Sequence, residues 1–439
     1  MKHSLFSVSR RAIGLLLAGA LSPMTFAQTP SSDGYVLDKV VQVSRHGVRP
    51  PTESNEKLLT KVTQRQWPTW LVPLGNLTGH GYTGAVEMGR YRGAVLRHAG
   101  LIAQGCPDAK HLLVHASPLQ RTKATAQALL DGMFPGCGLQ PTYVAGKQDA
   151  LFQANEMSFA ALDAEKAKAQ ILKALGGSVE AAQKRYAPFE ETLREVACLP
   201  DVNCAYGHEP WQLVQNEKGR FSIKGLSAGA NMGEVFRLEY SQGLPLEQVA
   251  FGHARTAAEV SSLMVLTKAK YDYLNDIPYI ASRGASELMN QISLALKQGT
   301  PLAPKDTTGA PPDVPLMLLV AHDTNISYLR TMLGFSWKLG DYIDNNIPPV
   351  GTLQFERYKE VKTGAYFLRI AFEAQSMDQI RDLTPLRGTA KPLSSDFKSA
   401  NDCRATRVGL LCPLKDAIAT VDHNIDPTAL TPYRFSPMP

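Results

Sequence analysis

Beyond its first 27 residues the sequence lacks any uninterrupted apolar run of about 18 residues, roughly the length at which a helix spans a bilayer. It also lacks any run of five or more like charges. The formal charge of +6 falls to about +3 when the first 27 residues are set aside, with 43 basic and 40 acidic residues left. These absences argue against membrane and nucleic-acid binding, so any electrostatic function is expected to be local.

Cysteine is scarce, at six in 439 residues, and no two cysteines have the CxxC spacing of a metal-binding finger. The sequence therefore predicts no metal site. Six cysteines allow 15 sets of disulfides. All six lie beyond residue 27, where an oxidising compartment would pair them. Proximity along the chain favours the pairs Cys106–Cys137, Cys198–Cys204 and Cys403–Cys412.

Residues 1–27 have the layout of a secretory signal peptide. Lys2, Arg10 and Arg11 precede the apolar run AIGLLLAGAL, and TFA places small residues just before Gln28. SRRAIG also fits a twin-arginine signal, so both export routes stay open. We expect a periplasmic or secreted protein that has no membrane attachment after signal cleavage.

Three later segments share one layout, an apolar run followed at once by polar residues. LDKVVQV (37–43) leads into SRHGVRPPT, HLLVHA (111–116) into SPLQRTKATAQ, and VPLMLLVA (314–321) into HDTNISYLRTMLG. Continuous apolar runs are typical of strands buried on both faces of a parallel sheet. Because ligands bind at the carboxyl edge of such sheets, we expect the three polar segments to meet there.

Helix-forming sequences follow the second and third of these runs. Ser117 and Pro118 predict the start of a helix through TKATAQALL. Asp323 or Thr324 is predicted to cap a second helix, which ends at Gly334. Both helices are therefore expected to begin just past the carboxyl ends of their strands.

The predicted fold class is α/β, with a mostly parallel central sheet flanked by helices and an inserted, mainly α-helical cap domain. Residues 155–272, rich in Ala, Glu, Lys and Leu at helical spacing, form the predicted cap. The core then comprises 28–154 and 273–439. Within it, GTLQFERYK and YFLRIAFEAQ are predicted to extend the sheet as an antiparallel pair.

The polar segments carry three arginines, whose charges would repel one another if no anion lay between them. Arg45 and Arg49 follow the first predicted strand, and Arg121 follows the second. Guanidinium groups are planar forks of donors that fit the oxygens of a phosphoryl group. We therefore expect a phosphate to fill this cluster, with Gly47 allowing a tight turn within it.

A histidine and a carboxylate supply what is needed to cleave a phosphate ester as well as bind it. His46 can take the phosphoryl group and release it to water, and the arginines should disfavour its charged form. Asp323 can protonate the departing alkoxide. A site that only bound an anion would have little use for this carboxylate.

RHGVRPP with a later HDTN and an intervening arginine, in an exported chain, resembles the histidine acid phosphatases of branch 2 of the histidine phosphatase superfamily. The likeness extends over nearly all of the chain after residue 27. It implies that His46 is phosphorylated and that Asp323 is the proton donor. It implies phosphate contacts from Arg45, Arg49, Arg121 and His322. It implies no metal or organic cofactor, a small phosphate monoester as substrate, and the three disulfides favoured above.

Two branches of this family share features with the chain. RHGVRPPT and HDTN resemble bacterial periplasmic phytases, in which Thr52 would be a substrate-side residue. LQRTKATAQ, FPGC and the close cysteines 198 and 204 resemble periplasmic glucose-1-phosphatases, which usually have asparagine in place of Gly47. Glu53 stands where phytases typically have lysine, which argues against phytate as the main substrate. Phytate and sugar phosphates are therefore both candidate substrates.

Two other functions fit parts of the sequence. GLSAG (225–229) matches the GxSxG motif of esterases, with Ser227 as nucleophile. That motif follows a buried strand, whereas the approach EKGRFSIKG is polar. A non-catalytic periplasmic protein that binds phosphorylated compounds would use the same arginines, but Asp323 argues against it.

Overall fold

The computed structural model describes residues 34–146, 148–200 and 204–438, so the predicted signal peptide and its cleavage site lie outside the described residues. Eight of the described strands form one sheet in the order β2-β5-β1-β6-β7-β10-β9, with β8 paired to β7, and β3 and β4 form a separate hairpin. The strands are β1 (Tyr35–Arg45), β2 (Leu112–Ala116), β3 (Gln212–Gln215), β4 (Phe221–Lys224), β5 (Leu316–Ala321), β6 (Thr352–Glu360), β7 (Tyr366–Ala374), β8 (Leu393–Phe397), β9 (Arg404–Thr406) and β10 (Gly409–Pro413).

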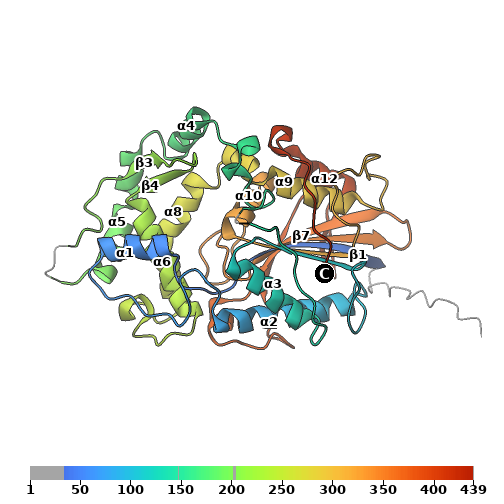
Figure 1. Cartoon of the computed structure of the whole chain (residues 1–439), viewed down its shortest axis with the longest axis horizontal. Coiled ribbons are helices and arrows are strands. Elements are labelled where there is room, and N and C mark those ends of the chain that lie inside the picture. The colour runs from blue at the N-terminus through green and yellow to red at the C-terminus, as the bar shows by residue number, and fades with distance from the viewer. Residues whose placement is uncertain (1–33, 147, 201–203, 439) are drawn as a thin grey trace, which may run out of the picture.

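Helices cover both faces of this sheet and make up most of the segment between β2 and β5 (Figure 1). The α-helices are α1 (Glu53–Val62), α2 (Gly79–His98), α3 (Gln120–Met133), α4 (Ala164–Ala174), α5 (Val179–Ala197), α6 (Leu226–Ser241), α7 (Ala257–Ser262), α8 (Val265–Leu274), α9 (Pro278–Lys297), α10 (Asp323–Leu333), α11 (Met377–Arg381) and α12 (Leu414–His423). Short 3₁₀ helices are η1 (Ala154–Glu156), η2 (Ser158–Ala160), η3 (Val249–Gly252) and η4 (Pro427–Ala429).

The three predicted apolar strands lie side by side and run parallel. Val114 on β2 and Gln42 on β1 both pair with Leu318 on β5, which lies between them. The expected antiparallel pair is also present, as β6 and β7, and β6 pairs with the free side of β1. The predicted α/β fold is confirmed, with parallel strands at one side of the sheet and antiparallel strands at the other.

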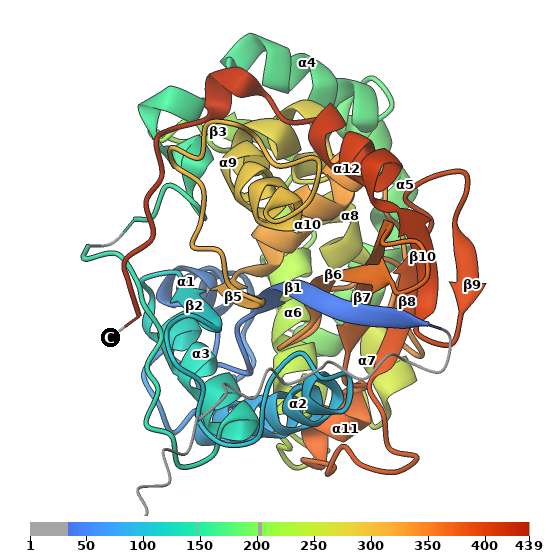
Figure 2. The ribbon, with the colours of Figure 1, turned by 90° about the vertical axis from the view of Figure 1, so that its right-hand side faces the viewer.

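Alternate side chains of the parallel strands enter two separate cores. Val40 and Leu318 pack with α2 and α3 on one face, whereas Val41 and Leu319 pack with α9, α10 and α12 on the other (Figure 2). Every residue of β2 and β5 is buried. This burial on both faces explains why these strands are continuously apolar, and it restricts their polar chemistry to the strand ends.

Helices α4 to α8 and the β3-β4 hairpin form a helical half beside the sheet half (Figure 1). Helix α1 comes from outside the predicted cap of 155–272, yet it packs against α6. The chain thus enters the helical half directly after the RHGVRPPT segment, before any of the predicted cap residues.

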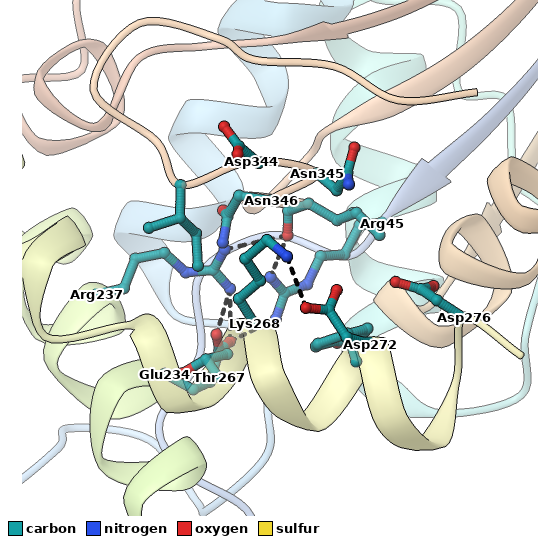
Figure 3. Close-up of a pocket in the computed structure, with 13 residues that line it drawn as sticks. Arg45, Glu234, Arg237, Thr267, Lys268, Asp272, Asp276, Asp344, Asn345 and Asn346 are labelled. Atoms are coloured by element: carbon teal, nitrogen blue, oxygen red, sulfur yellow. Dashed lines mark hydrogen bonds and ion pairs between the residues drawn. The ribbon is translucent and has the colours of Figure 1, made fainter. Parts of the chain in front are cut away.

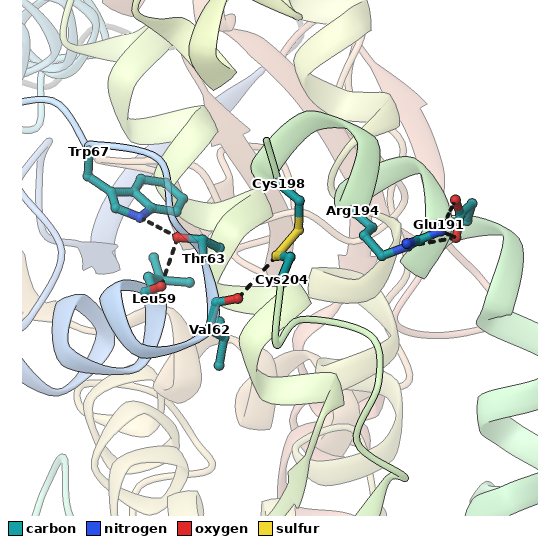
Figure 4. Close-up of a disulfide and its surroundings, with 8 residues drawn as sticks. All are labelled: Leu59, Val62, Thr63, Trp67, Glu191, Arg194, Cys198 and Cys204. Carbon is teal, nitrogen blue, oxygen red and sulfur yellow. Dashed lines mark hydrogen bonds and ion pairs between the residues drawn. A yellow bond between two sulfur atoms is a disulfide. The ribbon is translucent and has the colours of Figure 1, made fainter. Parts of the chain in front are cut away.

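The three disulfides pair as predicted: Cys106–Cys137, Cys198–Cys204 and Cys403–Cys412. Beside the second, the carbonyl oxygen of Val62 at the end of α1 lies 3.4 Å from Sγ of Cys204 and accepts the backbone N–H of Tyr206 at 3.0 Å (Figure 4). These contacts hold α1 against the helical half.

Three disulfides fit an exported protein. In the part of the chain that the structure describes, no helix is both long and apolar enough to span a membrane.

The loops closed by the first two disulfides predict different losses of stability. Cys106–Cys137 spans 31 residues and Cys198–Cys204 spans 6. A longer loop restricts the unfolded chain more, so paired Cys→Ser changes should cost about 4 kcal/mol for the first disulfide and about 2 kcal/mol for the second. In urea unfolding, the double variant without Cys106–Cys137 should have a lower midpoint than the one without Cys198–Cys204. The reverse order of midpoints would show that loop length does not determine the loss of stability.

Candidate active site

Backbone hydrogen bonds between the parallel strands continue past their carboxyl ends and align the residues that follow. The N–H of His46 donates to the carbonyl of Ala321 at 3.1 Å, and the N–H of Ser117 donates to that of Val320 at 2.9 Å. The rings of His46 and His322 consequently lie with their centroids 5.7 Å apart. The three polar segments therefore meet at one edge of the sheet, as predicted.

Helix α3 begins differently from the prediction. Its N-cap is Leu119, with no side-chain cap bond, and Ser117 does not cap it. The Ser117 hydroxyl instead lies 2.9 Å from Nε2 of His322, a tertiary hydrogen bond that fixes this imidazole. Ser117 is therefore part of the site and does not serve as a helix signal.

Helix α10 also has a different cap from the one predicted. His322 is its N-cap, so neither Asp323 nor Thr324 takes that position. The N–H of His322 donates to Oδ1 of Asn325 at 3.1 Å. Asp323 is the first helical residue, where the positive end of the helix dipole favours a carboxylate. The predicted end is confirmed, because Gly334 closes the helix in the left-handed conformation with φ of 70°.

A cavity of about 240 Å³ opens at this edge of the sheet. Five of the predicted site residues line it: His46, Arg49, Arg121, His322 and Asp323. They come from the segment after β1, from the first turn of α3 and from the start of α10. The structure thus brings two imidazoles, two guanidinium groups and a carboxylate around one volume.

Arg45 does not line this cavity but lies behind it. Its fully buried side chain donates from Nη2 to Glu234 at 2.5 Å and to Asp323 at 3.0 Å, and from Nη1 to the carbonyl of Ile347 at 2.6 Å. Arg237 donates to the same Glu234 carboxylate, so two arginines converge on it beside a small cavity of about 20 Å³ (Figure 3). Arg45 therefore fixes Asp323 from the rear.

The three arginines differ in how their charge is compensated. Burial disfavours the charged form of Arg45, but Asp323 and Glu234 outweigh it and raise its pKa. Arg49 and Arg121 have no carboxylate within ion-pair distance among the described residues. Burial, then the charge of Arg49, lowers the pKa of Arg121 to about 10, and burial lowers that of Arg49. The cavity therefore holds positive charge that an anion would neutralise.

His46 is held as a neutral imidazole with one free nitrogen. Its Nδ1 lies 2.9 Å from the carbonyl oxygen of Gly47, which can only accept, so Nδ1 carries the proton and Nε2 carries a lone pair. Burial lowers the pKa of His46 well below 6.5, and the charges of Arg121 and Arg49 lower it further. This combination gives a nucleophilic nitrogen that is not protonated in mild acid.

Burial and nearby charges also determine the protonation states of His322 and Asp323. Burial, and then the charge of Arg121, lowers the pKa of His322 to about 3. Burial acts to raise the pKa of Asp323, but Arg45, Arg49 and a hydrogen bond from Tyr271 outweigh it and lower that pKa below 3.8. In the free protein His322 is thus neutral and Asp323 is ionised at pH values above 4.

Gly47 has a different role from the predicted tight turn. Its φ is not positive. A Cβ at this position would lie 2.9 Å from the carbonyl oxygen of Gly81 in the first turn of α2 and 2.8 Å from a methyl group of Leu77. Gly47 is therefore required by the close approach of α2 to the RHGVRPPT segment, and an asparagine would not fit there without a backbone shift.

Thr52 lies next to the cavity but does not line it. It is the N-cap of α1, and its hydroxyl accepts the N–H of Asn55 at 3.4 Å. Glu53, the first residue of α1, is exposed and does not line the cavity either. Thr52 thus fixes the point at which the chain turns into the helical half.

A second cavity of about 570 Å³, which we call the outer cleft, adjoins the first. The two share Asn155, Arg220, Thr324 and Tyr328 as wall residues. Residues of α1, β4, α6 and α8 line the outer cleft, so it lies between α10 and the helical half. A ligand bound at His46 would extend into it.

Ser227 lies in the wall of the outer cleft, in the first turn of α6, and its hydroxyl donates to the carbonyl of Ile223 at 2.8 Å. The preceding strand β4 belongs to the two-stranded hairpin and is only partly buried. A nucleophile elbow needs a serine at the end of a buried strand, so the esterase hypothesis does not fit this setting.

Glu234 and Tyr271 take part in the site although the sequence did not predict them. Glu234 anchors Arg45, and Tyr271 donates to Asp323. Glu234 and Arg237 lie three residues apart among buried residues of α6, and an acid–base pair in an otherwise buried helix was a usable signal. Tyr271 offered no such signal, because one tyrosine at helical spacing is ordinary core composition.

Comparison with known proteins agrees with this geometry. The chain is 30% identical over 403 residues to phytase AppA of Escherichia coli strain K12, covering 87% of this chain and 91% of the relative. It is 30% identical over 430 residues to glucose-1-phosphatase of Salmonella typhimurium, covering 94% and 97%. The crystal structure of Klebsiella sp ASR1 phytase superposes with a TM-score of 0.85 at 38% identity, covering 90% of this chain and 98% of that chain.

The family model for branch 2 of the histidine phosphatase superfamily matches residues 36–373. That range includes the RHGVRPPT segment, the start of α3, the helical half and the start of α10. It also includes β6 and most of β7, the first two strands of the antiparallel side of the sheet. The chain belongs to branch 2 of the histidine phosphatase superfamily and is a phosphatase.

Proposed function

We propose that this protein is an exported acid phosphatase, periplasmic or secreted, that hydrolyses phosphate monoesters through a phosphohistidine on His46. The observation that carries the proposal is the single cavity around which His46, Arg49, Arg121, His322 and Asp323 converge. Residues 155–272 act as a cap over the reacting group, since the outer cleft lies between them and α10. No nucleic acid or membrane partner is proposed.

Phosphate binding rests on the uncompensated charges of the cavity. Arg49 and Arg121 would bind the non-bridging oxygens, and the imidazole of His322, fixed by Ser117, would donate to a third. Arg45 would contribute through its field and by holding Asp323. Because these groups are fixed before the substrate arrives, they can stabilise the charge of the transition state without reorganising.

In the proposed reaction, Nε2 of His46 attacks phosphorus and the bond to the leaving oxygen breaks. Asp323 donates a proton to that oxygen, and the same carboxylate then takes a proton from the water that hydrolyses the phosphohistidine. Asp323 is ionised in the free site, so the proton must enter with the substrate. A phosphate monoester keeps one proton below its second pKa of about 6, which makes the reaction favourable in mild acid.

Phytate and sugar phosphates are both proposed substrates. The close contact of Gly47 with α2 supports a loop of the phytase type, since the glucose-1-phosphatases usually have asparagine there. Glu53 lines neither cavity, which weakens the argument that its charge disfavours phytate. Turnover of p-nitrophenyl phosphate in acid tests the function itself, and phosphate binding without turnover would favour the non-catalytic binder.

His46→Ala is expected to abolish the covalent intermediate. Wild-type protein quenched in alkali during turnover of ³²P-labelled substrate should retain label, because phosphohistidine survives base, whereas the variant should retain none. His111→Ala is a matched control, since His111 is exposed and pairs only with Asp108. Labelling of the His46 variant at the wild-type level would assign the nucleophile to another residue.

Asp323→Asn should slow substrates according to their leaving groups. The amide cannot donate a carboxyl proton, so kcat/KM on an alkyl phosphate should fall by about 10²–10⁴. An aryl phosphate, whose leaving group needs less protonation, should lose much less. Asp306→Asn, at an exposed site between α9 and β5, should change neither rate. Equal losses of kcat/KM on both substrates would show that Asp323 is not the proton donor.

The charge of Arg121 predicts the titration of His46. In ¹⁵N-histidine-labelled wild-type protein, the His46 ring should stay neutral at pH values where a free imidazole becomes protonated, because burial and three cations lower its pKa. Arg121→Met removes one cation and should move that titration to higher pH. His46→Asn identifies the resonance. An unchanged titration in the Arg121 variant would show that the arginine charge does not act on the nucleophile.

A further inference from the structure

The outer cleft contains one cation that has no partner among the described residues. Lys270 on α8 lines it, and its ammonium forms neither a hydrogen bond nor an ion pair with any residue that the structure describes. The other cation of the same wall, Arg220, lies 2.9 Å from a carboxylate oxygen of Glu156. Lys268, two residues before Lys270, is 2.6 Å from Asp272. Lys270 is thus the cation of this wall left for a ligand.

The ammonium of Lys270 is also partly removed from water. Burial lowers its pKa, and the charges of Arg220 and Arg49 lower it further, whereas Asp323 and Glu234 raise it. These interactions with Arg49 and Asp323 place Lys270 within electrostatic reach of the phosphate cavity. A half-buried charge with no partner is unfavourable, and an anion bound beside it would relieve that cost.

The remaining polar groups of the outer cleft are neutral. Hydroxyl and amide side chains, which can both donate and accept, suit the hydroxyl groups of a polyol. They are Ser54, Asn55, Asn155, Asn216, Ser222, Ser227, Asn231, Asn275, Thr324 and Tyr328. A volume of about 570 Å³ accommodates a six-carbon skeleton with its substituents.

We propose that Lys270 binds a second phosphate group of the substrate, and that this residue makes the protein favour substrates with several phosphates over those with one. The inference rests on the proposed function and narrows its substrate class. The reacting phosphate lies at His46, the carbon skeleton passes Thr324 and Tyr328, and a further phosphate contacts the ammonium of Lys270. Lys270 is a specificity residue that does not touch the reacting atoms.

The test compares substrates with one phosphate and with several on the full-length protein. Lys270→Gln should lower kcat/KM about tenfold for fructose 1,6-bisphosphate and for phytate, because one charge-assisted contact is lost. The same change should alter kcat/KM for fructose 6-phosphate and for p-nitrophenyl phosphate by no more than about twofold, much less than the tenfold loss. Lys270→Arg keeps the charge and should restore most of the loss. Lys184→Gln, at an exposed position of α5, is the matched control.

The substrate pattern separates the possible outcomes. Equal loss on mono- and bisphosphates would make Lys270 a structural residue and overturn the inference, as would no loss on either. Retained p-nitrophenyl phosphate turnover by Lys270→Gln shows that the variant is folded. Failure of the wild-type protein to hydrolyse p-nitrophenyl phosphate would instead contradict the proposed function, whatever the effect at Lys270.

Discussion

Two guanidinium groups that pair with no carboxylate of the described residues, the buried one of Arg49 and the partly buried one of Arg121, are the constraint on which this structure depends. Desolvated positive charge is costly unless it is paired, and a chain without an anionic ligand would gain by removing it. The fold instead holds these groups beside two neutral imidazoles. Only the sheet makes this possible, because strands buried on both faces give the segments that follow them a rigid support.

Arg45 and Arg49 have different roles because they lie in different layers of the fold. Arg45 is the last residue of β1, so its side chain lies under the site and meets Glu234 of the helical half. Arg49 lies past the strand end and faces the cavity. The same short motif therefore supplies one arginine that joins the two halves of the molecule through a carboxylate, and a second whose charge is left for the ligand.

The sequence predicted the features that local pattern determines, and it failed where distant contacts decide. Buried parallel strands are continuously apolar, so their positions and their common edge could be read directly. The caps of α3 and α10 were wrong because Ser117 and Asp323 bond to groups more distant than their own helix ends. The pairing of Arg45 with Glu234 joins residues 189 positions apart, and no spacing in the chain indicates it.

In the proposed reaction, Asp323 is ionised in the free site and still acts as the acid, and the field of the site explains how. In the free site, Arg45, Arg49 and the start of α10 all favour the carboxylate form of Asp323. A bound phosphoryl group reverses that field, because its negative charge neutralises Arg49 and Arg121 and repels the carboxylate. Protonation of Asp323 is then coupled to substrate binding. In the proposed reaction, such a site binds the protonated monoester and holds its proton beside the leaving oxygen, which a pure anion receptor has no reason to do.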